Sequence, residues 1–98
     1  MADSLDLHAG SLIGRCPGQL SGEIDDQIVL LSIETGNYFH FNAVGSRIWS
    51  LIETPMAANE LIERLLAEFA VDRATCDRQV VDFLSDLSAN RLISVESR

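Results

Sequence analysis

The hydrophobic period of this chain changes once, at Asn42, and that change limits the folds open to it. Before it, over residues 19–41, apolar and polar residues alternate or form short apolar runs, as they do in β-strands. After it, apolar residues recur every three or four positions, as they do in amphipathic helices. A run of strands followed by a run of helices is typical of an α+β domain.

The first half predicts a three-stranded antiparallel meander, with strands at 19–24, 27–33 and 38–41. Asp25-Asp26 forms the first polar break. A tight turn over 34–37 forms the second, because Gly36 and Asn37 both tolerate positive φ. The third strand is the last of the meander, so one of its edges is expected to be unpaired.

The second half predicts three helices. Asn42 is expected to cap the first, and Thr54-Pro55 to end it, since the residue before a proline avoids helical geometry. Asp72 is expected to cap the third helix, and Asn90 to end it in the left-handed conformation. The expected order is therefore β-β-β-α-α-α, a winged helix-turn-helix-like layout.

The chain of 98 residues fits one domain. Residues 1–18 are expected to form an N-terminal arm, partly extended or flexible, with at most one short strand and a turn at Pro17-Gly18. Residues 19–98 are expected to form the folded domain, with 92–95 as a last extended segment.

Charge and hydropathy exclude several classes of partner. The formal net charge is −8, and the seven arginines are scattered, which disfavours nucleic acid and anionic lipid. The third helix would bring Asp77, Asp82 and Asp86 toward DNA phosphates against Arg78 alone. The start of the sequence has no signal-peptide pattern, and no apolar run approaches a membrane span, so the predicted location is cytoplasmic.

Residues that could carry catalysis or bind a metal do not form a pattern. His8 and His40 lack partners at metal-ligand spacing. Cys76 falls on the apolar stripe of the third helix, where a buried hydrophobe is the expected role. Cys16 and Cys76 are expected to be free thiols, with a disulfide as the alternative. The prediction is a protein that is not an enzyme and has no cofactor or metal.

What remains is an open strand edge beside a helix, which a peptide can occupy by β-strand addition. Core packing is the expected role of the aromatic Phe41 and Phe83, and a groove role that of Tyr38, His40, Gln79 and Val80. On that basis Val80→Arg is expected to cripple peptide binding and leave the fold intact. The full set of predicted peptide-binding residues is Tyr38, Phe39, His40, Phe41, Cys76, Gln79, Val80 and Phe83.

Over about 19–95 the sequence resembles the PqqD-like family. The resemblance is carried by Ile28-Val29-Leu30-Leu31, Thr35-Gly36-Asn37-Tyr38-Phe39, Phe41-Asn42, Gly45-Ser46-Arg47-Ile48-Trp49 and Val80-Val81-Asp82-Phe83-Leu84. These proteins are RiPP recognition elements, which bind the leader of a ribosomally made precursor peptide. The resemblance implies the same fold, with the leader added beside the third strand and against the third helix. Family members usually carry glycine where this chain has Arg91, which leaves the capping role to Asn90.

Within the family, this free-standing unit looks similar to the discrete leader-binding proteins of lasso-peptide biosynthesis. That implies a precursor peptide and a leader peptidase as partners. The alternative within the family is a peptide chaperone for a radical-SAM maturase, as in pyrroloquinoline quinone (PQQ) biosynthesis. The alternative of another class is an acidic winged-helix homodimer without a peptide ligand, which uses the same edge to pair with itself.

Overall fold

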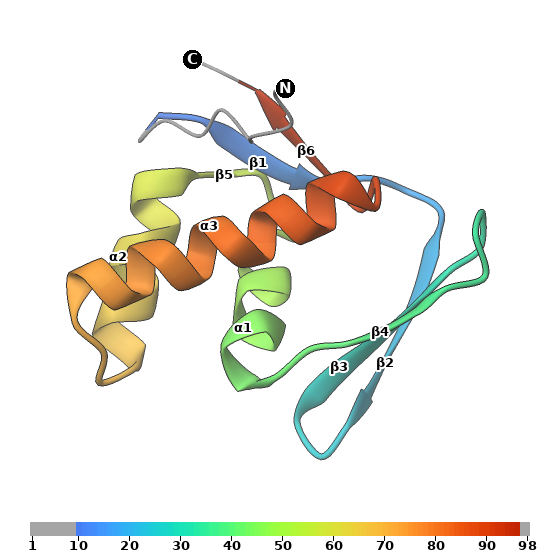
Figure 1. Cartoon of the computed structure of the whole chain (residues 1–98), viewed down its shortest axis with the longest axis horizontal. Coiled ribbons are helices and arrows are strands. Elements are labelled where there is room, and N and C mark those ends of the chain that lie inside the picture. The colour runs from blue at the N-terminus through green and yellow to red at the C-terminus, as the bar shows by residue number, and fades with distance from the viewer. Residues whose placement is uncertain (1–9, 97–98) are drawn as a thin grey trace.

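The computed structural model describes residues 10–96, and predictions for residues 1–9 and 97–98, such as the place of His8, lie outside this range. It is an α+β structure of two three-stranded antiparallel sheets and three helices (Figure 1). The elements are β1 (Leu12–Arg15), β2 (Gln19–Ile24), β3 (Gln27–Ser32), β4 (Tyr38–His40), α1 (Ala43–Leu51), β5 (Met56–Ala57), α2 (Ala58–Glu68), α3 (Arg73–Ala89) and β6 (Ile93–Glu96).

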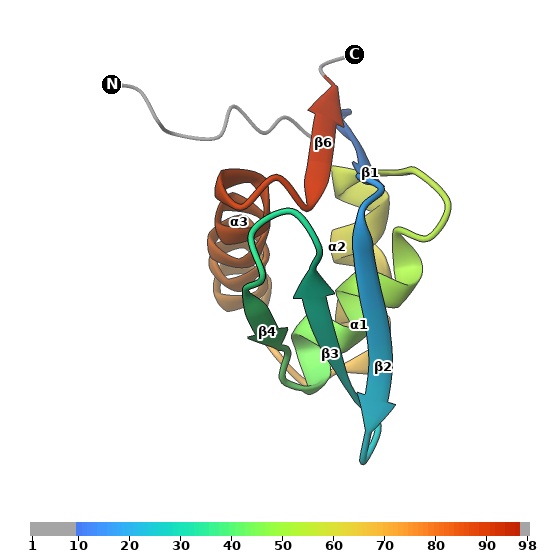
Figure 2. The ribbon, with the colours of Figure 1, turned by 90° about the vertical axis from the view of Figure 1, so that its right-hand side faces the viewer.

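The predicted meander is confirmed as the sheet β2-β3-β4. Asp25 and Asp26 form its first turn with φ of 53° and 67°, the left-handed region that aspartate tolerates better than most residues. Gly36 supplies the positive φ, 76°, of the second turn. In Figure 2 this sheet stands in front of the helices, with β4 on the side of α3.

The predicted order β-β-β-α-α-α was incomplete, because a second sheet exists with the order β5-β1-β6. β1 lies in the predicted arm and pairs with β6 from Leu12↔Glu96 to Arg15↔Ile93. β5 has only two residues and adds to the other edge of β1. Local periodicity cannot predict that β5 pairs with β1, because the two strands lie far apart in the sequence. The division of the chain at residue 18 stays a prediction.

Two of the three helices, α1 and α3, begin at the predicted N-caps, whereas α2 begins after Ala57 without a side-chain cap. Asn42 accepts a hydrogen bond from the backbone N–H of Gly45 (2.8 Å) and begins α1. Asp72 accepts from the backbone N–H of Thr75 (3.1 Å) and begins α3. The Thr75 hydroxyl also donates to Asp72, which lowers the pKa of that carboxyl.

One apolar core joins both sheets to the helices. It contains residues from β1, β3 and all three helices. The buried Ser46 hydroxyl fixes α1 to the first sheet, because it accepts from the backbone N–H of Ile28 (2.8 Å) and donates to the carbonyl of Phe41 (3.3 Å). The core residues with the least exposure include Ile13, Leu30, Ile48, Trp49, Ile52, Leu61, Leu65, Val80, Leu84 and Leu87.

Candidate functional site: an open strand edge beside a helix

β4 is an edge strand, since the sheet order is β2-β3-β4. The backbone N–H of Phe41 donates to Ile28 (2.9 Å) and the carbonyl of Asn37 accepts from Ser32 (2.9 Å), so both residues bond toward β3. Successive residues of a strand direct their backbone groups to alternate sides. The N–H and C=O groups of Tyr38 and His40 therefore point to the open edge, where they are available to another strand.

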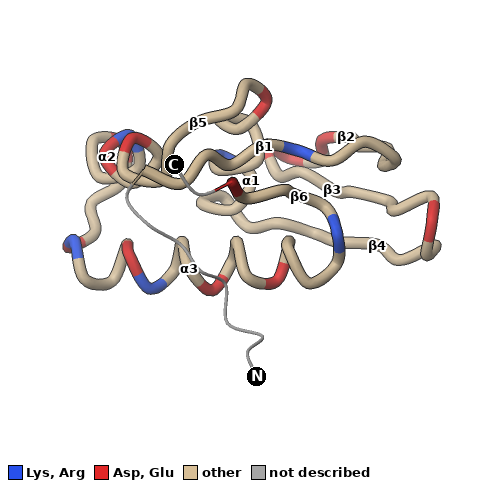
Figure 3. The backbone as a smooth tube through the Cα atoms, turned by 90° about the horizontal axis from the view of Figure 1, so that it is seen from above, with Lys and Arg blue, Asp and Glu red and all other residues tan. Residues whose placement is uncertain are grey.

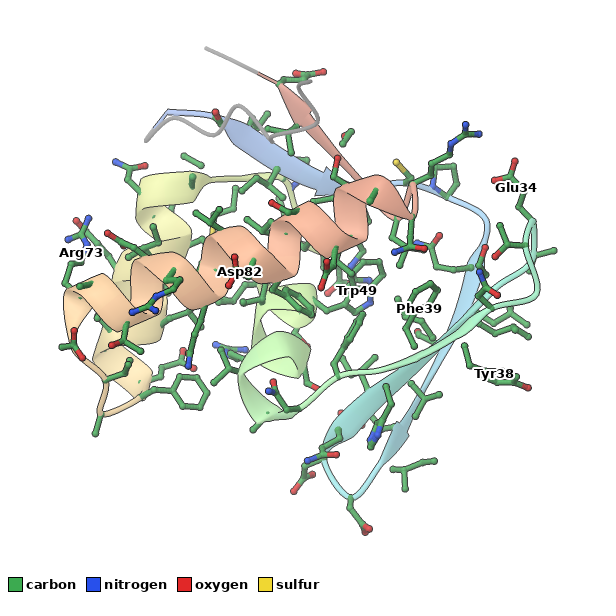
Figure 4. The ribbon with its side chains drawn as sticks, in the orientation of Figure 1. Glu34, Tyr38, Phe39, Trp49, Arg73 and Asp82 are labelled. Atoms are coloured by element: carbon green, nitrogen blue, oxygen red, sulfur yellow. The ribbon has the colours of Figure 1, made fainter. Side chains whose placement is uncertain are left out.

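The side chains of β4 alternate between the two faces of the sheet. Tyr38 is 73% exposed and turns away from the helices, whereas Phe39 lies on their side and packs against the core (Figure 4). His40 is exposed and Phe41 is buried. One aromatic pair therefore faces the core, as the alternation predicted.

The α3 side of the site is built around Phe83. Its ring meets the Phe41 ring edge-on with centroids 4.9 Å apart. A methyl group on Gly45 would come within 2.8 Å of the Phe83 ring, so α1 approaches α3 closely because this helical residue is a glycine. Beside this contact lies a cavity of about 210 Å³, lined by Asn42, Val44, Gly45, Ile48, Gln79, Asp82 and Phe83.

The structure places the eight predicted site residues in two groups. Tyr38, His40 and Gln79 are exposed, and Phe39 and Phe83 are half-buried. The side chains of Tyr38 and His40 lie on the face away from the helices, so the groove role predicted for them was wrong, and only their backbone groups face the open edge. Phe41, Cys76 and Val80 are 5%, 2% and 0% exposed and lie in the core. Placing Val80 on the groove surface was wrong. Phe83, for which core packing was the expected role, packs against the core and also lines the cavity.

Gly45, Val44, Ile48 and Asp82 line the cavity but were not predicted. Glycine is unfavourable inside a helix, so Gly45 was a sequence signal for a close approach.

Nothing in the described site is set up for nucleophilic or metal chemistry. Burial raises the pKa of the Cys76 thiol, and the Asp77 carboxylate raises it further, so the thiol is protonated near neutral pH. Cys16 and Cys76 are both free, as predicted. Over residues 10–96, no group of three or more His, Cys, Asp or Glu residues could hold a metal ion. In the same range no helix is long and apolar enough to cross a membrane.

These features define a class of protein: a small α+β domain with an uncovered strand edge, a half-buried aromatic strand and a helix-lined cavity beside it. Residues 27–93 match the family model of Coenzyme PQQ synthesis protein D (PqqD). The chain therefore belongs to the PqqD family, and the family resemblance seen in the sequence is confirmed.

Two solved structures share this fold. "TbiB1 in Complex with the TbiA(beta) Leader Peptide" is 42% identical, with a TM-score of 0.76 over 83% of this chain and 94% of that chain. "Lasso peptide synthetase B1 complexed with the leader peptide" is 20% identical, with a TM-score of 0.73 over 84% of this chain and 96% of that chain. A search of the curated proteins finds no match.

Proposed function

We propose that this protein binds the leader segment of a ribosomally synthesised precursor peptide by β-strand addition to β4, and catalyses no reaction itself. The observation that carries the proposal is the open edge at Tyr38 and His40, next to the cavity of Phe83. It is supported by the 42% identical TbiB1, whose structure is a complex with a leader peptide. Phe39, Gln79 and Phe83 would contact the leader, while Phe41, Cys76 and Val80 support them from the core.

Titration calorimetry of the full chain tests this function. The probes are the synthetic TbiA(beta) leader and the leader of the precursor peptide encoded beside this chain's gene. Two or three apolar anchors at about 1.5–3 kcal/mol each and several strand hydrogen bonds at about 0.5–1.5 kcal/mol each exceed an ordering cost of about 2–5 kcal/mol. A dissociation constant near or below about 1 µM is expected. Scrambled leaders are the control.

The homodimer alternative predicts a different result from the same material. If the chain sediments as a tight dimer and takes up neither leader, the β4 edge serves self-pairing and the leader-binding proposal is wrong. A monomer that becomes a one-to-one complex on adding leader supports leader binding.

We further propose that the chain has a winged helix-turn-helix-like arrangement and that this arrangement serves peptide and not DNA recognition. Acidic residues lie along α3 (Figure 3), among them Asp77, Asp82 and Asp86. They would repel the phosphates of a duplex.

We also propose that the protein is cytoplasmic, because free cysteines fit a reducing compartment.

The partner that receives the leader is, in this proposal, a leader peptidase. The outer face of β2-β3-β4 is apolar and unusually open: Leu20 and Ile24 are each 60% exposed, with Val29, Leu31 and Tyr38 between them in a shallow cavity of about 240 Å³. A leader strand beside β4 would extend this same face. The maturation enzyme can thus contact the protein and the bound leader together.

A radical-SAM maturase is the alternative partner. The neighbouring genes distinguish a leader peptidase from a radical-SAM maturase.

Leu20→Glu is expected to abolish capture of the leader peptidase while leaving leader affinity within about twofold of the original, because Leu20 is exposed and lies off the β4 edge. Ala74→Glu is the matched control: it adds the same charge at an exposed position in the first turn of α3. Pull-down with the peptidase and calorimetry with the leader measure the two effects. Equal capture by both variants would contradict this docking face.

A further inference from the structure

Arg91 occupies a backbone position that favours glycine. The end of α3 has the Schellman hydrogen bonds, from the N–H of Arg91 to Ser88 (3.0 Å) and from the N–H of Leu92 to Leu87 (2.9 Å). Arg91 is the residue in the left-handed region, with φ of 61°, whereas Asn90 has φ of −97°. The expectation that Asn90 would take the left-handed cap was therefore wrong.

The strain of the left-handed backbone at Arg91 is not offset by contacts of its side chain. A left-handed residue with a Cβ atom is strained relative to glycine. Over residues 10–96, no side chain or carbonyl forms a hydrogen bond or ion pair with the Arg91 guanidinium, in contrast to Arg47, which pairs with Glu68 at 2.7 Å. The Schellman end of α3 needs a left-handed residue but not an arginine, so the choice of a strained arginine over glycine leads to the hypothesis that its side chain has a function.

Arg91 also lines a cavity of about 250 Å³ together with 17–19, 32–34, Asn90 and Leu92. Residues of the turn after β3 and of the loop after α3 line this cavity. Figure 2 shows that the turn and the loop lie at the same end of the sheet β2-β3-β4. A peptide strand paired with β4 leaves the sheet at this end, past Tyr38. The residues that flank the paired segment would then pass near the loop after α3, which carries Arg91.

We propose that Arg91 is a specificity-determining residue that binds a carboxylate of the leader next to its strand-forming segment. The proposal rests on the leader-binding function above. A guanidinium is a planar fork of donors that matches a carboxylate with two parallel hydrogen bonds. In a chain of net charge −8, an acidic leader residue needs a local cation such as this one. Glu34 lines the same cavity, and its carboxylate would repel an acidic leader residue that approaches Arg91.

Arg91→Gly separates this role from a structural one, because the two roles move stability and affinity in different directions. The variant relieves the left-handed strain, so its denaturation midpoint is expected to rise. Its affinity for the leader is expected to fall about tenfold, which corresponds to about 1.4 kcal/mol. Arg91→Lys, which keeps the charge and loses the fork, should fall between the two. Glu34→Gln should bind the leader at least as tightly as the original chain.

The reciprocal change is made in whichever leader binds the unmodified chain, with each Asp and Glu replaced singly by Asn or Gln. One replacement is expected to weaken binding to the original chain about tenfold and to leave binding to Arg91→Gly unchanged. Equal affinity of the original chain and Arg91→Gly overturns the role of Arg91 while leader binding stands, as does a loss that no carboxylate accounts for. Failure of every leader to bind the original chain refutes leader binding itself, and this inference with it.

Discussion

Val80→Arg is expected to unfold the domain and not merely to disturb a peptide groove. Val80 is fully buried on α3, among core residues that include Leu84 and Leu87. A guanidinium at this position would lose its hydration without a partner, at a cost of several kcal/mol. Small domains have only about 5–15 kcal/mol of stability in total. Circular dichroism should show the loss of the cooperative thermal transition.

Gln79→Arg is the matched control, since it places the same side chain one residue earlier, at an exposed position that lines the cavity of Phe83. This variant is expected to melt within a few degrees of the unmodified chain and to bind the leader more weakly. A Val80→Arg variant that melts cooperatively at the original temperature would show that the core can open at this point, and would restore Val80 to the groove.

His40→Pro is expected to reduce leader affinity about 100-fold or more, a loss of about 2.7 kcal/mol, while the fold survives. Proline at position 40 has no backbone N–H, so the outward-pointing donor of His40 is lost. The proline ring would also stand in the way of an incoming strand. Edge strands tolerate proline where the missing N–H faces away from the sheet. The ladder bonds of Phe39 and Phe41 to β3 are left in place.

His40→Ala is the control for the imidazole, because it removes the side chain and keeps the N–H. Its leader affinity is expected to stay within about threefold of the original, well under 1 kcal/mol. Calorimetry measures both affinities, and thermal denaturation confirms that both variants fold. If proline and alanine weaken binding equally, the leader does not pair with the β4 backbone, and another surface must hold it.

The parts of the fold that sequence reasoning predicted are those built from local patterns. The β2-β3-β4 meander follows from two-residue alternation and from turn residues such as Gly36, and the helices follow from their apolar stripes and from the caps Asn42 and Asp72. The short strand allowed in the arm and the extended segment predicted at 92–95 correspond to β1 and β6, but β5 and the pairing of these strands into one sheet were missed. Such short segments carry too few residues for a period to be read.

The candidate site was predicted at the level of elements and less well at the level of side chains. The alternation in β4 correctly separated Tyr38 from Phe39. On α3, periodicity identifies one apolar stripe but not which of its borders faces the groove. Val80 lies at the centre of the stripe and Phe83 at its border. Which border faces the groove becomes clear only from the packing of Gly45 against Phe83.

The pairing of β1 with β6 has a practical consequence for work with this protein. It fixes Leu12 opposite Glu96, so the described chain enters and leaves the domain at one pole, next to the second sheet (Figure 1). Fluorophores or tethers placed at residue 10 or 96 would therefore start at the second sheet and not at the sheet that contains β4.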